Sequence, residues 1–313
     1  MRHVLAAVAL AVAVAVLAVA IPASGRPVRG APKCKLFPSN NHWNLRVDKL
    51  PVLSNSDAMV RGIGAGDNLH PDFGSGLYEG RPIGIPYTTV SNEQKRVKVS
   101  FEYDDESDRG PYPIPRNAPI EGGSSSDGDR HVIVVDRDRC VLYELYAAYP
   151  QNGGASWRAG SGAIFNLKSN KVRPAGWTSA DAAGLPILPG LARYEEVKAG
   201  KIDHALRFTV SRSRRAYIYP ARHFAASSTD PDLPAMGQRL RLKASFDTSG
   251  YPRQARVILN ALKRYGMIVA DNGSDWYISG APSKGWDNDE LNALKGVEGS
   301  NFEVVDTSRL PRP

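Results

Sequence analysis

Five histidines after residue 24 are the first residues to consider for acid–base chemistry, because an imidazole exchanges protons near neutral pH. They are His42, His70, His131, His204 and His223. His131 is the main candidate for a catalytic base, since an expected hairpin over residues 130–149 places it opposite Glu144. That carboxylate would orient the imidazole and raise its pKa. A histidine that only pairs across two strands also explains the pattern.

His204 and Arg207 lie in an alternating stretch, residues 202–210, on opposite faces of the expected strand. His204 falls on the apolar face, where it is either a base or a hydrogen-bonded core residue. Arg207 shares its face with Asp203 and either binds a substrate carboxylate or forms an ion pair. His223 follows an expected strand over residues 216–220, a position from which a side chain can reach a groove.

These side chains suit two kinds of sugar chemistry. Hydrolysis of a glycosidic bond needs two carboxyl groups, for which Glu144, Asp181 and Asp203 are candidates. Elimination from a uronic acid needs a base and a cation. The residues available for it are His131, His204, His223, Tyr217, Tyr219, Arg207 and Arg222. Asp271 is a weaker candidate, because it precedes an Asn-Gly turn signal that explains it without catalysis.

Aromatic rings beside loop residues suit a sugar substrate, because flat rings stack on the apolar faces of pyranosides while polar groups take the hydroxyls. The expected substrate-binding residues are Trp157, Trp177, Tyr219 and Arg222. Packing in the core explains the tryptophans as well.

Several familiar chemistries are excluded by missing motifs. The chain has no Gly-x-Ser-x-Gly elbow, no His-Glu-x-x-His zinc helix and no phosphate-binding Gly-x-x-x-x-Gly-Lys loop. We therefore expect no nucleotide, no cofactor and no metal. The acidic loop 104–108 could hold calcium, but Arg109 stands where a calcium loop would have its glycine. Residues 129–131 (DRH) lack the glycine of a familiar nuclease motif, so a nuclease is a minor alternative.

The cysteine count and the charge point to an exported protein. Cys34 and Cys140 are the two cysteines of the chain, and an even pair without metal-type spacing predicts a disulfide, with two buried thiols as the alternative. The formal net charge is +8. A basic secreted protein is attracted to acidic partners such as uronic-acid polymers, although solubility alone also explains the charge.

The N-terminus reads as a targeting segment. Arg2 and His3 precede an apolar run over residues 4–20, which predicts a signal peptide of residues 1–24; a membrane anchor is the alternative. Residues 25–33 are rich in Pro, Gly and Arg and are expected to form a flexible lead-in. Residues 34–313 are then a single β-rich domain, soluble and monomeric, with no membrane anchor after cleavage.

Most of the elements that must position the candidate residues are short strands. Alternation of apolar and polar residues predicts strands at 95–103 and 202–210. Further strand-like segments are expected at 131–135, 140–147, 161–167, 216–220 and 238–244. Residues 34–91 are crowded with Gly and Pro and suit loops and strand pieces. Helices are expected at 193–199, 253–265 and 287–295, the last opening with a capping-box pattern. A further hairpin is expected with strands 267–270 and 275–279.

Many short strands with few helices predict a mainly β fold. The expected architecture is a curved, jelly-roll-like β-sandwich, or a barrel, with a few peripheral helices. No alternation of strand and helix indicates a doubly wound fold.

Four segments carry a resemblance to a known group. They are residues 69–78 (LHPDFGSGLY), 176–186 (GWTSADAAGLP), 203–208 (DHALRF) and 265–273 (YGMIVADNG). These segments resemble those of a family of secreted bacterial proteins. The resemblance implies export and a single structural unit, and it assigns no activity and no catalytic residue.

The sequence thus predicts a secreted carbohydrate-active protein, a hydrolase or lyase whose partner is an acidic extracellular polysaccharide. A non-catalytic module that binds a cell wall or a polysaccharide is the alternative.

Overall fold

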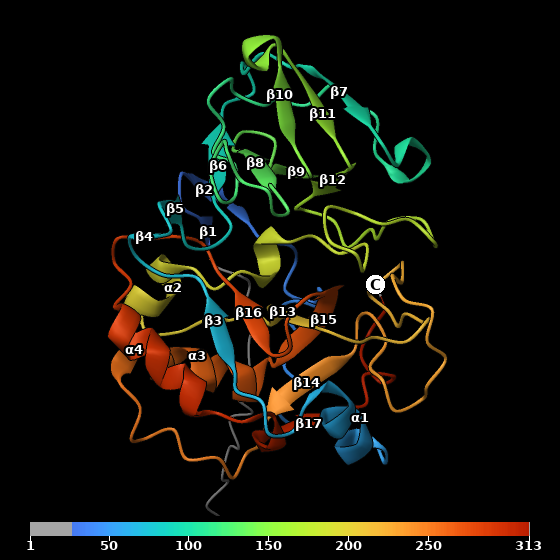
Figure 1. Ribbon diagram of the computed structural model, residues 1–313, viewed down its shortest axis with the longest axis vertical. Coiled ribbons are helices and arrows are strands. Elements are labelled where there is room, and N and C mark those ends of the chain that lie inside the picture. Colours follow the sequence, from blue (N-terminus) through green and yellow to red (C-terminus); the bar gives the residue numbers. More distant parts are fainter. Residues whose placement is uncertain (1–26, 313) are drawn as a thin grey trace, which may run out of the picture.

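The computed structural model describes residues 27–312, which form a mainly β structure with 27% strand and 16% helix (Figure 1). The strands are β1 Pro27–Val28, β2 Ala31–Lys35, β3 His70–Asp72, β4 Leu77–Tyr78, β5 Arg81–Pro82, β6 Tyr87–Val90, β7 Lys98–Phe101, β8 Val132–Asp136, β9 Val141–Tyr146, β10 Tyr149–Gln151, β11 Ser156–Ala159, β12 Ser161–Asn166, β13 Leu206–Val210, β14 Arg239–Leu242, β15 Met267–Asn272, β16 Tyr277–Ser279 and β17 Phe302–Val304. The α-helices are α1 Ser56–Ile63, α2 Tyr194–Lys198, α3 Arg253–Arg264 and α4 Asn288–Asn292. The expected signal peptide lies outside the described residues.

One half of the molecule is a sandwich of two sheets. A four-stranded sheet, β12-β9-β8-β6, packs on a three-stranded sheet, β10-β11-β7. Strand β8 is buried along its whole length, and its side chains alternate between two cores. Val132 and Val134 face Trp157 of the second sheet, whereas Ile133 and Val135 join the large core below. The alternation of a strand therefore links the two cores.

The other half is a mixed six-stranded sheet, β17-β14-β15-β13-β16-β3, flanked by the helices (Figure 1). Helix α3 buries one face, with Ile258, Leu259 and Leu262, in the same core that receives Ile133 and Val135. One continuous core thus joins the two halves. Within residues 27–312 the sheets stay open and no barrel closes. The predicted mainly β class with peripheral helices is confirmed, and the sheets fit the sandwich alternative.

The β8–β9 hairpin forms as expected, but its register differs by two residues. Ile133 pairs with Glu144, so His131 lies beyond the paired strands. The turn occupies residues 137–140, one position further along the chain than expected, and Asp136 accepts hydrogen bonds from the backbone of Asp138 and Arg139 within it. The pairing of His131 with Glu144 was therefore wrong.

The expected hairpin around the Asn-Gly signal is also absent from the described sheet. Strand β13 lies between β15 and β16, parallel to β15 and antiparallel to β16. Strand β13, from an earlier part of the chain, thus occupies the position beside β15 that β16 would have in a local hairpin. Residues 216–220 contribute an isolated bridge, Tyr217 with Met236, in place of a strand.

The helices are close to their expected positions. Asp287 accepts hydrogen bonds from the backbone of Asp289 and Glu290 at the start of α4, as an N-cap does. Glu290 bonds the backbone of Gln254 instead of completing a capping box. Helix α1 was not expected, because its segment lies in a region crowded with Gly and Pro.

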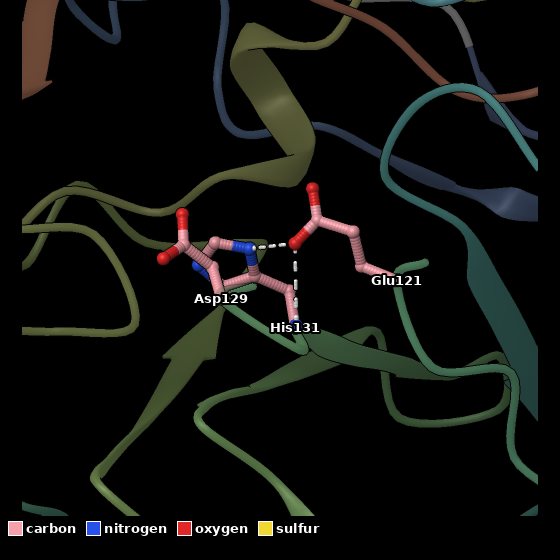
Figure 2. A group of neighbouring side chains, drawn as sticks. All are labelled: Glu121, Asp129 and His131. Carbon is pink, nitrogen blue, oxygen red and sulfur yellow. Dashed lines mark hydrogen bonds and ion pairs between the residues drawn. The ribbon is translucent and has the colours of Figure 1, made fainter. Parts of the chain in front are cut away.

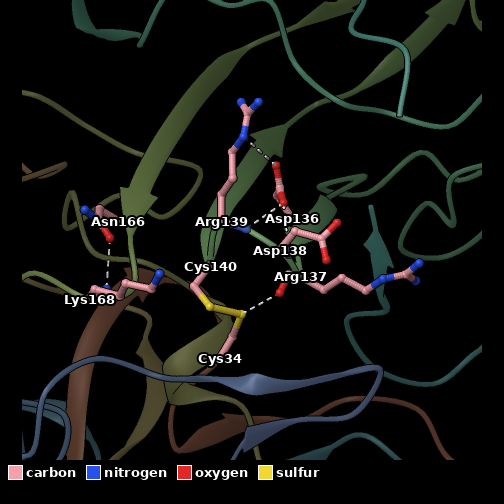
Figure 3. Close-up of a disulfide and its surroundings, with 8 residues drawn as sticks. All are labelled: Cys34, Asp136, Arg137, Asp138, Arg139, Cys140, Asn166 and Lys168. Carbon is pink, nitrogen blue, oxygen red and sulfur yellow. Dashed lines mark hydrogen bonds and ion pairs between the residues drawn. A yellow bond between two sulfur atoms is a disulfide. The ribbon is translucent and has the colours of Figure 1, made fainter. Parts of the chain in front are cut away.

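A disulfide joins Cys34 of β2 to Cys140 at the end of the β8–β9 turn, as predicted (Figure 3). The bond closes a loop of 106 residues, which in the chain-entropy description stabilises the fold by about 5 kcal/mol. The segment before it is not the flexible lead-in that was expected. From Pro27 it forms the β1–β2 hairpin, which buries Val28 and Ala31 in the main core.

No helix within residues 27–312 combines the length and the apolar composition needed to cross a membrane.

Candidate functional site

A cleft of about 440 Å³ opens where the two halves meet. Its lining residues are Tyr103, Glu106, Asp129, Tyr146, Ser161, Thr178, Ser179, Ala180, Ala182, His223, Ala225, Asp271 and Asn272. Three carboxylic acids and two tyrosines face this space, together with one histidine. The cleft is therefore acidic, although the chain as a whole is basic.

The register of the six-stranded sheet lines up four polar side chains beneath the cleft. Asp72 pairs with Ser279, and Arg207 follows in the adjacent strand. A bulge in β15 then brings Asp271 beside Thr209 and so onto the same face as Arg207. Bulges re-aim a side chain and are frequent beside active sites.

Arg207 is held in place by Asp181 at the base of the cleft. Its guanidinium donates two hydrogen bonds to the Asp181 carboxylate, at 2.9 and 2.7 Å, and another to the Ser279 hydroxyl. Burial opposes its charge, but the Asp181 carboxylate outweighs burial and raises the pKa of Arg207. Arg207 is therefore always charged, and the Asp181 carboxylate neutralises this charge at the base of the cleft.

Asp271 keeps its proton to a much higher pH than an ordinary aspartic acid and titrates close to neutral pH. Burial and then the negative charge of Asp181 raise its pKa to about 7, while Arg207, whose nearest nitrogen is 3.8 Å away, lowers it only in part. The Asp271 side chain is 23% exposed and lines the cleft. A carboxylic acid with these properties can donate a proton to a bound substrate.

Asp129 faces the same cleft from a loop that precedes β8, and its side chain is exposed. The loop is fixed by Arg130, whose guanidinium donates to the backbone oxygens of Ser124, Ser126 and Ala148. Arg130 has φ of 52°, a left-handed conformation, and this turn separates Asp129 from His131. The loop therefore presents a solvent-accessible carboxylate on a rigid support.

His131 forms a buried ion pair with Glu121 (Figure 2). Its Nδ1 lies 2.6 Å from Glu121 Oε2, and its Nε2 donates to the backbone oxygen of Ala180 at 3.0 Å. Burial opposes the charge of the ring, but the Glu121 carboxylate, assisted by Asp129, raises the pKa of His131 to about 9. At neutral pH the ring is a cation whose two nitrogens both donate, so it fixes Glu121 and cannot accept a proton.

Glu121, Asp129 and His131 are also the group that could hold a metal ion, because their candidate ligand atoms lie within 4.8 Å of one another. Nε2 of His131 carries a proton for Ala180, so a metal would need Nδ1. That nitrogen is itself protonated below about pH 9. Proton and metal therefore compete for one position, so a metal would bind His131 only by displacing the proton.

The carboxylates of the acidic loop are engaged with neighbouring groups. Asp104 pairs with Arg109, and Asp108 pairs with Arg173. Glu106 accepts a hydrogen bond from the backbone of Thr178. The acidic loop, for which calcium was the minor reading, is thus held by these contacts and forms part of the cleft wall.

Glu144 lies fully buried behind the cleft. Its carboxylate accepts hydrogen bonds from the backbone N–H groups of Ile187 and Leu188, at 2.9 to 3.1 Å. Burial raises the pKa of Glu144 to about 7 against the effect of these hydrogen bonds. Glu144 does not line the cleft, so its effect on the site is electrostatic only.

Other candidates lie elsewhere. His204 is buried and bonds Glu196, Asp203 pairs with Lys201, and Trp157 is 2% exposed within the sandwich core. Tyr219 packs edge-on against His42, away from the cleft. His223 does line the cleft, with its Nδ1 bonded to the backbone oxygen of Ala182.

Trp177 and Arg222 lie together in a second groove, of about 760 Å³. Thr178 and His223, the residues that follow them in the chain, line the first cleft. The two hollows therefore share a wall.

Comparisons with protein-family models, with curated proteins and with solved structures found no match to this chain.

Proposed function

We propose that this chain is a secreted carbohydrate-active hydrolase that cleaves a glycosidic bond of an acidic polysaccharide. The observation that carries the proposal is the pair of carboxyl groups in the cleft: Asp271, with a pKa of about 7, and the exposed Asp129. Such a pair divides into a proton donor and a proton acceptor, as glycoside hydrolysis requires.

In the proposed reaction Asp129 removes a proton from a water molecule, and the water oxygen attacks the anomeric carbon. The bond between that carbon and the glycosidic oxygen breaks as Asp271 gives its proton to the leaving oxygen. Asp271 ends ionised and Asp129 protonated, and the solvent restores both. Tyr103, which is 47% exposed, and the half-buried Tyr146 offer rings and hydroxyls for the sugar.

Hydrolysis suits the cleft better than elimination does. His131 cannot be the base for elimination, because both of its nitrogens already donate; His223, whose Nδ1 bonds the backbone oxygen of Ala182, is the histidine that lines the cleft. The cation for elimination must meet a uronate, and Arg207 is neutralised by Asp181. Carboxylates at 106 and 129 would also repel a uronate at the reacting position.

Export is supported by the disulfide, because such bonds persist in oxidising compartments. The cleavage of a signal peptide after residue 24 remains a prediction, as does the monomeric state.

The test compares the protein of residues 25–313 with its Asp271→Asn and Asp129→Asn variants on a panel of acidic and neutral polysaccharides. New reducing ends and unsaturated-product absorbance are both followed. We expect reducing ends without absorbance, and a loss of on the order of 10²–10⁴-fold in kcat in each variant. Asp289→Asn, an exposed residue of α4, is the control and should keep full activity.

Two results would contradict the proposal. Absorbance from unsaturated products would replace hydrolysis by elimination. Retention on an insoluble polymer with no new ends on any substrate would favour the binding module.

A further inference from the structure

The second groove has a charge opposite to that of the cleft. Its charged lining residues are Asp108, Lys171, Arg173 and Arg222, and Trp177 lies among them. Three cations face one carboxylate here. An anionic ligand is therefore favoured in this groove and disfavoured in the cleft.

The cations of the groove differ in what they already bind. Arg173 is buried, and each of its three guanidinium nitrogens has a partner: it pairs with Asp108 and donates to the backbone oxygens of Glu106 and Thr178. Lys171 is exposed, and within residues 27–312 neither Lys171 nor Arg222 has an ion-pair partner. Arg173 thus has a structural role in the groove, whereas the positive charges of Lys171 and Arg222 are available to bind a ligand.

Arg222 is held in a defined position. Its Nε donates to the backbone oxygen of Arg173 at 3.0 Å, which leaves the outer nitrogens of the guanidinium for a second partner. Arg173 also stacks over the ring of Trp177, 5.4 Å from its centroid, and so fixes that ring beside Arg222. A half-buried indole beside a planar cation offers a face for a sugar ring and a fork for its carboxylate.

Three short segments separate the groove from the cleft. In each segment one residue lines the groove and a residue one or two positions away lines the cleft. The pairs are Asp108 with Glu106, Trp177 with Thr178, and Arg222 with His223. Neighbouring Cα atoms are about 3.8 Å apart, so a chain of sugars can cross this wall and occupy both hollows.

We infer that the groove around Lys171, Trp177 and Arg222 is a binding subsite for an acidic sugar of the same polymer whose neutral sugar is cleaved beside it. The inference rests on the proposed function. The substrate class is then a polysaccharide in which uronic acids are spaced by neutral sugars. A homopolymer of uronic acid would put a carboxylate into the acidic cleft.

The experiment measures KM and kcat for the protein of residues 25–313 and for the double variant Lys171→Gln, Arg222→Gln. The substrates are an alternating acidic polysaccharide, the same polymer with its carboxylates reduced to alcohols, and a homopolyuronate. We expect the double variant to raise KM on the acidic polymer by on the order of tenfold or more, with kcat unchanged. On the reduced polymer the two proteins should have equal KM values, and the homopolyuronate should not be cleaved.

Lys168→Gln is the matched control, an exposed lysine close in the chain that does not line the groove. Equal melting temperatures establish that the variants fold. An unchanged KM in the double variant, while Asp271→Asn is inactive, overturns the subsite and leaves the hydrolase intact. Binding without cleavage that the double variant abolishes supports the subsite and rejects the hydrolase. Neither binding nor cleavage of any acidic polymer overturns both.

Discussion

The pKa of Asp271 depends on a residue that never reaches the cleft. Asp181 neutralises Arg207 by two hydrogen bonds, and its own charge adds to the effect of burial on Asp271. Without this neutralisation Arg207, 3.8 Å from Asp271, would favour the ionised form of the acid. Asp181 therefore helps to keep the proton on Asp271, in addition to its structural role of holding Arg207.

The variant Asp181→Asn tests this dependence through the pH profile. In the wild-type protein the rate should fall as the pH rises through about 7, because Asp271 loses its proton. In the variant Arg207 is free to pair with Asp271, so the fall should begin about 1–3 pH units lower. The double variant Asp181→Asn, Arg207→Gln removes both charges and should move the fall back toward neutral pH. A profile that keeps its shape in the single variant would contradict the assignment.

The ion pair of His131 makes a second prediction, about stability. The folded pKa of about 9 lies above the ordinary histidine value of 6.5, so the pair stabilises the fold fully below pH 6.5 and this contribution is lost as the pH rises through 9. The unfolding free energy of the wild type minus that of His131→Gln should therefore shrink by on the order of 3 kcal/mol between pH 6 and pH 10. Urea denaturation at several pH values measures it.

His70→Gln serves as the control for that experiment. Burial lowers the pKa of His70, so its protonation penalises the folded state and the pH trend has the opposite sign. A difference that stays constant with pH in His131→Gln would mean that the ring is not charged in the fold.

Part of the site could be predicted at the level of single residues. His131, Arg207, His223 and Asp181 were selected from their types and neighbours, and all lie at or beneath the cleft. Glu121 was missed, because it follows a Pro-rich loop and nothing in the local pattern links it to His131. Asp271 was assigned to a turn, and a cross-sheet bulge gives it its environment instead.

At the scale of the elements, the loop that carries Asp129 rests on a strained residue. Arg130 combines a left-handed backbone with three hydrogen bonds from its guanidinium. A left-handed conformation costs a non-glycine residue roughly 1–2 kcal/mol, and the guanidinium offsets this cost.

Two variants separate the backbone from the side chain at this position. Arg130→Ala and Arg130→Gly both lose the hydrogen bonds and should both reduce the rate, because Asp129 is no longer held. The glycine variant should nevertheless be more stable than the alanine variant, by about 1 kcal/mol in urea denaturation, since glycine tolerates the left-handed conformation. A more stable alanine variant would show that the loop changes its backbone when the side chain is removed.

Prediction of the elements succeeded where the pattern was long and local. Helix α3 was found from its apolar stripe, and β8 and β9 from their strand-like segments on either side of a polar turn. The register of that hairpin was missed because the turn depends on Asp136, whose side chain bonds the loop backbone. The pairing of β15 and β16 failed because a distant strand, β13, lies between them. Short-range signals do not contain that information.

At the scale of the whole molecule, the fold class followed from the number of short strands and turn residues. The existence of the cleft did not, because its walls come from the sandwich and from the six-stranded sheet. The net charge of the chain was also a poor guide to the site. The positive charge predicted an acidic partner, whereas the cleft itself carries carboxylates. The cations available to a ligand, Lys171 and Arg222, line the neighbouring groove.

The order of strands in the large sheet has a consequence for how the protein is made. Strand β3 pairs with β16, so residue 70 cannot form its strand pairing until residue 277 has been synthesised. Val52 likewise bridges to Val305 near the end of the chain. A ribosome therefore releases the first third of the protein long before its partners exist, and such distant pairings assemble slowly. Asp271 lies in β15, one of the last strands, so it joins Asp129 in the cleft only when synthesis is nearly complete.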